Sequence, residues 1–132
     1  MAAAKDRGLP PEVVEKAKHH ILDTFAAMIS GSALPDAALV NGVLAQSDET
    51  DDSHGPSQSH PGASIVPAAL AIGEELRASG EHYLRAVTLG YDVGPRLTMA
   101  LGGVTFRDES RRSTHAFSGN FGSAAAAGCI AG

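Results

Sequence analysis

The sequence has few large side chains, one cysteine and no long apolar run, and each shortage excludes a class of protein. Aromatic residues make up 5% of the 132 residues and tryptophan is absent, so the core has to form from small side chains that pack closely. Cys129 is the single cysteine, which excludes an internal disulfide and fits a reducing compartment. No apolar stretch reaches the roughly 18 residues that a membrane span needs.

Basic residues are also scarce, since 10 lysines and arginines face 15 aspartates and glutamates, for a net charge of −5. Binding to nucleic acid or to an anionic membrane needs a basic surface. The one basic cluster, within residues 107–112, is interrupted by two acidic residues. Charged residues precede the first apolar run, so no signal peptide is visible. We expect a cytoplasmic protein that binds neither nucleic acid nor membrane.

The length fits a single domain, residues 1–132, and apolar periodicity predicts an all-α helical bundle. A first helix begins within residues 9–12 and ends at Gly31, and a second follows Asp36 and runs to about Ala45. A third spans 65–78 with Ser64 as its N-cap and Gly80 after its end, and a fourth begins at Glu81. Residues 102–113 are read as a loop, and a last helix runs from Ser118 to Ile130.

Small residues mark two of these helices. Ala86, Gly90 and Gly94 lie four residues apart in the fourth helix. Glycine inside a helix costs about 1 kcal/mol relative to alanine, so this spacing predicts a neighbouring helix packed backbone to backbone. The last helix has no polar face, which predicts burial on all sides, either by a second subunit or by further chain.

The loop between the second and third helices, Ser47 to Gly62, concentrates carboxylates, imidazoles and hydroxyls. A calcium loop does not fit, because glycine and glutamate are missing where that motif needs them. His54 and His60 are six residues apart across Gly55 and Pro56, which does not fit a helical zinc motif, so we expect no metal. The alternatives are a solvated acidic linker and acid/base chemistry, in which an imidazole transfers a proton beside a carboxylate.

Five collinear blocks resemble the MmgE/PrpD family, which includes 2-methylcitrate dehydratase, cis-aconitate decarboxylase and iminodisuccinate epimerase. The blocks are HILDTFAAMISG (20–31), NG (41–42) with DDSH (51–54), HP (60–61) with VPAALA (66–71), GYDV (90–93) with RL (96–97), and FGSAAAAG (121–128). The resemblance implies cofactor-free proton chemistry on a small polycarboxylate, in a dimer with a large helical domain and a smaller lid.

From the residue chemistry together with this resemblance, we assign roles to residues of this chain. His60 and His115 would carry protons, and Asp52 and Glu49 would orient or relay them. Substrate carboxylates would be held by Asp51, Ser53, and the helix start that includes Gly119, Asn120 and Gly122. Arg96 is a further anion partner, or else a partner in a surface ion pair.

Three departures separate this chain from the family pattern. The segment before Asn41 is shorter than in the family, and Ser113 stands where many members have a histidine, with His115 two residues on. The family's catalytic lysines and its lid belong to a continuation past the alanine run. The alternative function is therefore a catalytically inactive helical remnant that serves as an oligomerising module.

Overall fold

The computed structural model describes residues 8–30, 37–47 and 50–132, and these residues form an all-α fold, as predicted. They contain no strand, only an isolated bridge between His54 and Ser59. The elements in chain order are α1 (Pro11–Ser30), α2 (Ala37–Ser47), the 3-10 turn η2 (Gly55–Ser57), α3 (Gly62–Glu75), α4 (Gly80–Ala100), α5 (Val104–Ser110) and α6 (Thr114–Ala131). Asp36 lies outside the described residues. None of the described helices is long and apolar enough to cross a bilayer.

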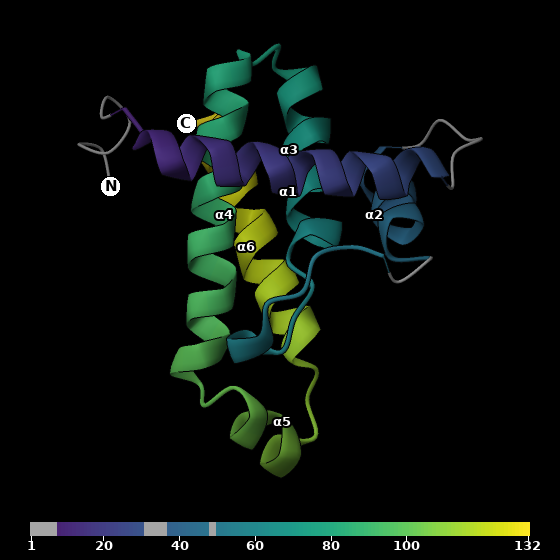
Figure 1. The fold of residues 1–132 in the computed structure, drawn as a ribbon, viewed down its shortest axis with the longest axis vertical. Coiled ribbons are helices and arrows are strands. Elements are labelled where there is room, and N and C mark those ends of the chain that lie inside the picture. Colours follow the sequence, from purple (N-terminus) through teal and green to yellow (C-terminus); the bar gives the residue numbers. More distant parts are fainter. Residues whose placement is uncertain (1–7, 31–36, 48–49) are drawn as a thin grey trace.

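Helices α4 and α6 lie side by side, and α3 packs against both of them. In Figure 1, α1 crosses in front of α3 and α4, while α5 lies at the far end of the molecule, between α4 and α6. Helix α2 packs on α3 and α1. The buried apolar residues where these helices meet are Ile21, Ile65, Val66, Ala69, Ala86, Val87, Ala126 and Ile130.

The predicted close approach at the glycines of α4 is confirmed. A Cβ atom at Gly90 would lie 2.8 Å from the carbonyl oxygen of Gly122, and one at Gly94 would collide with the carbonyl oxygen of Ser118. Both carbonyl oxygens belong to the backbone of α6, so at these two glycines the backbones of α4 and α6 are in direct contact. Glycine is required here because any larger residue would push the helices apart.

Two predicted boundaries of α3 are wrong. The helix begins at Gly62 with Pro61 as its N-cap, three residues before the predicted start, and Ser64 lies in its first turn. It ends at Glu75, because Arg77 adopts a left-handed backbone with φ of 50°, which breaks a right-handed helix. Gly80 opens α4 instead of following α3.

The reading of residues 102–113 as a loop is also wrong, since α5 occupies Val104–Ser110. Left-handed residues flank this short helix, Gly103 with φ of 55° and Arg111 with φ of 56°. Helix α6 then begins at Thr114, four residues before the predicted start, and Ser113 accepts a hydrogen bond from the Ala116 amide at 3.2 Å. A serine with extended backbone is a favourable N-cap.

Among the described residues, helix α6 is buried on one side only, and the cover of its other side by a second subunit or by further chain stays a prediction. Its buried residues are Thr114, Ser118, Gly119, Gly122, Ala126 and Ile130. Asn120 and Ala124 are exposed, and the Phe121 side chain is 50% exposed.

The end of α6 is fixed to α4 by a histidine. The Nε2 atom of His82 lies 2.8 Å from the carbonyl oxygen of Cys129, one of the terminal carbonyls that the helix itself leaves unpaired. We expect His82→Ala to lower the free energy of unfolding by about 1 kcal/mol, because a part-buried acceptor then loses its donor. Urea denaturation measures this, with His19→Ala on the exposed face of α1 as control, and an equal loss in both variants would contradict the assignment.

Candidate active site

The structure brings together the two histidines that the sequence singled out, His60 from the loop before α3 and His115 from the first turn of α6. Their imidazole rings are stacked, with centroids 4.8 Å apart and planes inclined by 28°. The residues are 55 positions apart in the sequence, so only the packing of the loop against α6 places them side by side. Stacked imidazoles disfavour double protonation, because like charges at this distance repel.

Hydrogen bonds fasten the loop to α6 on either side of His60. The Thr114 hydroxyl donates to the carbonyl oxygen of Gln58 at 2.6 Å, and the Ser59 hydroxyl donates to the hydroxyl of Ser118 at 3.1 Å. Ser57 continues this buried hydroxyl chain, 2.7 Å from Ser59. These contacts hold the backbone on which His60 is carried, so the ring pair is set by a fixed frame.

Three oxygen atoms surround one nitrogen of His60. Its Nδ1 atom lies 2.8 Å from the carbonyl oxygen of Asp52, 3.3 Å from the Ser53 hydroxyl and 3.5 Å from a carboxylate oxygen of Asp51. A backbone carbonyl can only accept a hydrogen bond, so Nδ1 carries the proton in the neutral ring. Nε2 is then the nitrogen with the free lone pair, which is the form a general base requires.

Asp51 is the most constrained carboxylate of the site. Its side chain is fully buried, and among the described residues neither carboxylate oxygen has a hydrogen-bond donor. Burial raises the pKa of Asp51, while the positive charge of a protonated His60 opposes this rise. Burial lowers the pKa of His115, and the charge of His60 lowers it further. A carboxylate with a raised pKa beside an imidazole with a lowered pKa is typical of functional sites, where perturbed pKa values cluster.

We expect Asp51→Asn to stabilise the fold at neutral pH. A raised pKa means that the folded state favours the protonated acid, so the wild-type protein loses stability as the pH rises above the ordinary value of 3.8 and the carboxylate ionises. The variant lacks that loss, and its advantage should therefore vanish as the pH falls below 3.8. Thermal unfolding between pH 3.5 and pH 7 measures this.

The control for this prediction is Asp108→Asn on the exposed surface of α5, where the carboxylate contacts only its neighbour Arg107 among the described residues. Its effect on stability should stay within about 0.5 kcal/mol. An Asp51→Asn protein less stable than the wild type at pH 7 would show that the carboxylate is held by favourable interactions after all.

The other predicted site residues lie at varied distances from the histidine pair. Ser53 is exposed and contacts His60. Asp52 reaches His60 through its backbone, while its carboxylate accepts a hydrogen bond from the Gly62 amide at 2.9 Å, at the start of α3. Glu49 lies outside the described residues. Arg96 forms a surface ion pair with Asp92 one turn away on α4.

The predicted anion site at Gly119, Asn120 and Gly122 rests on a helix start that is wrong. These residues lie in the second and third turns of α6, where backbone amides are engaged within the helix. A Cβ atom at Gly119 would lie 2.7 Å from the Ser64 hydroxyl oxygen, and one at Gly122 would meet Ile65. Both glycines therefore serve to pack α6 against α3, and Asn120 is exposed.

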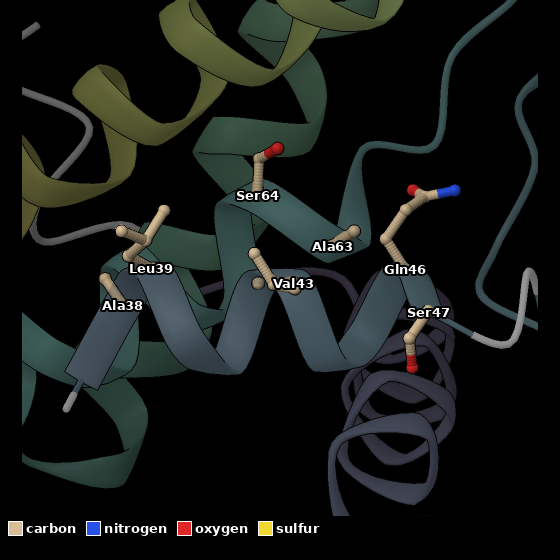
Figure 2. Close-up of a pocket in the computed structure, with 8 residues that line it drawn as sticks. Ala38, Leu39, Val43, Gln46, Ser47, Ala63 and Ser64 are labelled. Atoms are coloured by element: carbon tan, nitrogen blue, oxygen red, sulfur yellow. The ribbon is translucent and has the colours of Figure 1, made fainter. Parts of the chain in front are cut away.

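A groove of about 640 Å³ lies beside α2, near the start of α3. Figure 2 shows the residues that line it, with Leu39 and Val43 from α2 opposite Ala63 and Ser64 from α3. The groove residues of α3 lie close to His60 in the sequence, since α3 begins at Gly62. Neither His60 nor His115 lines the groove. Among the described residues, no group of three histidine, cysteine or acidic side chains is arranged to hold a metal ion.

Comparison with known proteins gives one family. The model of the MmgE/PrpD N-terminal domain matches residues 32–132. The chain is 26% identical to a cis-aconitate decarboxylase-like protein, oryM, of Aspergillus oryzae over 136 residues, covering 75% of this chain and 28% of that protein. It is 25% identical to a cis-aconitate decarboxylase of Aspergillus terreus over 130 residues, covering 72% of this chain and 26% of the relative. No solved structure matches significantly.

The chain thus spans about a quarter of the length of these curated relatives. The first alignment is longer than the whole 132-residue chain although it includes only 75% of it. The relative therefore has segments within the aligned region that have no counterpart here.

Proposed function

This chain belongs to the MmgE/PrpD family, and on that premise we propose that it carries the proton-transfer group of a lyase or isomerase that acts on small polycarboxylates. The observation that carries the proposal is the stacked pair of His60 and His115 beside the buried carboxylate of Asp51. An imidazole that keeps its hydrogen on Nδ1 offers Nε2 as a base near neutral pH. The second imidazole can then hold or return a proton.

The reaction class follows from what such a pair can do at carbon. In a decarboxylation, the bond to the leaving CO2 breaks and its electron pair stays on the substrate, where an imidazolium supplies the proton for a new C–H bond. In a dehydration or epimerisation, Nε2 takes a proton from the carbon next to a carboxylate, and the electron pair expels water or is reprotonated. In the dehydration or epimerisation the second ring supplies a proton, to the leaving hydroxide or to the opposite face of the carbon, whereas the decarboxylation uses the single proton of one imidazolium.

The names of the relatives favour decarboxylation, since both are described through cis-aconitate. We propose a small polycarboxylate as the substrate class, with cis-aconitate as the first compound to test. The buried carboxylate of Asp51 supports a proton-transfer role, because its one ion-pair contact among the described residues is with His60 and a buried carboxylate without hydrogen bonds costs stability. In this proposal Asp51 keeps His60 oriented, and Ser53 contacts the same nitrogen from the exposed side.

The experiment is to incubate the 132-residue chain with cis-aconitate in D2O and to follow both CO2 release and deuterium at carbon. Release of CO2 with one solvent deuterium in the product supports decarboxylation. Deuterium at carbon without CO2 supports the dehydration or epimerisation form of the proposal. Absence of both, with a protein shown to be folded by circular dichroism, overturns it.

A second function is supported by a different observation, the apolar surface of α2. The Leu39 side chain is 79% exposed and that of Val43 is 60% exposed, at the rim of the groove in Figure 2. An interaction module, such as a homodimer formed through this surface, would bury them. A stable oligomer by sedimentation that dissociates in Leu39→Glu, without any proton exchange, would favour this function over the enzymatic one.

A further inference from the structure

A second polar cluster lies behind the loop, around the first residue of α3. The Cα atom of Gly62 is surrounded by three oxygen atoms, because a Cβ placed on it would lie 2.6 Å from the Asp52 carboxylate, 2.6 Å from the Tyr91 hydroxyl and 2.7 Å from the Thr24 hydroxyl. The residues come from the loop, α4 and α1. Asp52 is 6% exposed at its side chain, so its carboxylate is almost closed to water.

Tyr91 has no hydrogen-bond partner at its buried hydroxyl among the described residues. Thr24 already donates its hydroxyl hydrogen to the carbonyl oxygen of His20, so towards Tyr91 it presents only acceptor lone pairs, which are neutral and weaker than the carboxylate of Asp52. Burial raises the pKa of Tyr91, and the negative charge of Asp52 raises it further. The phenol is therefore a neutral donor, and the Asp52 carboxylate is the charged acceptor beside it.

His20 completes the cluster from the side of α1. Its ring lies against that of Tyr91, with centroids 5.2 Å apart, and its Nδ1 atom is 3.6 Å from the second carboxylate oxygen of Asp52. The titratable groups that face Asp52 are thus His20 from α1 and Tyr91 from α4, together with Asp51 and His60 on the loop itself.

Asp52 connects this cluster to the candidate active site. Its carboxylate accepts from the Gly62 amide, and its backbone carbonyl lies 2.8 Å from Nδ1 of His60. The side chain is anchored at the start of α3, so its position fixes the direction of the carbonyl group. We propose that Tyr91 is a positioning residue: its hydroxyl, which has no other partner among the described residues, lies beside the Asp52 carboxylate and orients it through its dipole, and the Asp52 carbonyl then keeps His60 in the tautomer with hydrogen on Nδ1. The catalytic consequence rests on the proposed function, whereas the tautomer does not.

The experiment compares Tyr91→Phe with the wild-type chain. The substitution removes one hydroxyl and keeps the ring that packs on His20. Nitrogen-15 NMR of the imidazoles should show neutral His60 with hydrogen on Nδ1 in the wild type and a mixture of both tautomers in the variant. With cis-aconitate, kcat should fall by about tenfold, as for other residues that orient a histidine through a second group, while KM stays within twofold.

The matched control is Tyr83→Phe on the same helix. Tyr83 is also a part-buried tyrosine, but its hydroxyl donates to the carbonyl oxygen of Val66 at 3.4 Å, away from Asp52. The Tyr83→Phe substitution should therefore leave the His60 tautomer and kcat unchanged. If Tyr91→Phe fails to fold by circular dichroism, Asp52→Asn replaces it, because the amide keeps the shape of the acceptor but removes its charge. The same mixture of tautomers is expected.

The outcomes separate this proposal from the proposed function. A His60 tautomer that is unchanged in Tyr91→Phe, or in Asp52→Asn where that variant replaces it, overturns the positioning role whether or not the chain is active. A changed tautomer in a chain that never turns over substrate supports the positioning role and counts against the enzyme. A tautomer that changes equally in Tyr83→Phe also overturns it, since the effect would then follow from any lost hydroxyl on α4.

Discussion

His60→Gln is expected to slow the incorporation of solvent deuterium into cis-aconitate or its product by about 10²- to 10⁴-fold, the usual contribution of a positioned acid or base. Glutamine can still donate a hydrogen bond to the carbonyl of Asp52, so the loop keeps its main contact. It has no group that takes up a proton near neutral pH. The rate is measured by NMR in D2O at several pH values, and the variant should lose the pH dependence that a titrating imidazole gives.

The control for this result is His19→Gln on the exposed face of α1, which should retain the wild-type rate. A His60→Gln protein that is folded and fully active would remove His60 from the reaction. The same finding for His115→Gln alone would leave His60 as the sole proton carrier of the pair.

Gly94→Ala is expected to cost about 3 kcal/mol of stability, at the upper end of the usual range for overpacking. The added methyl group would collide with the carbonyl oxygen of Ser118 and would also lie 3.2 Å from the Cα atom of Gly122. These are backbone atoms of α6, which cannot rotate away, so the helices must separate. Urea denaturation of the variant measures the loss.

Gly128→Ala provides the contrast on α6 itself. Nothing lies within 4 Å of a Cβ atom at this position, so only the helix preference of alanine acts. The variant should be more stable than the wild type by about 0.5–1 kcal/mol. If Gly94→Ala and Gly128→Ala changed stability by the same amount, helix preference alone would explain both, and the close packing of α4 on α6 would have no energetic role.

Local sequence was sufficient for the elements with a strong period or a strong breaker. The apolar positions of residues 11–30 and the spacing of Gly90 and Gly94 predicted α1 and the approach of a neighbour to α4. It was insufficient where two caps compete. Ser113 and Ser118 are both reasonable N-caps, and the choice depends on tertiary contacts, because Ser118 is buried and bonded to Ser59. Helix α5 was missed because its seven residues are mostly polar and show no buried face.

The same distinction applies to the candidate site, because its chemical groups could be predicted from the sequence but their arrangement could not. His60 and His115 were identifiable as chemical groups, and family resemblance marked Asp51 and Asp52. Local patterns do not contain the hydrogen bonds between distant residues that bring the rings together, such as the one from the Thr114 hydroxyl to the backbone carbonyl of Gln58. The part played by Tyr91 was also hidden, since in the sequence it is one more inward residue of an amphipathic helix.

The glycine contacts between α4 and α6 have a mechanical consequence for the site. Side chains in an ordinary interface can change rotamer and absorb a small displacement, but Gly90, Gly94 and Gly122 have no side chain that could do so. Any sliding of α4 is therefore passed undiminished to the helix that carries His115. A mutation far from the imidazoles that displaces α4 should therefore also move α6 and the His115 ring. The distance between the rings of His60 and His115 then depends on how the whole helix pair is packed.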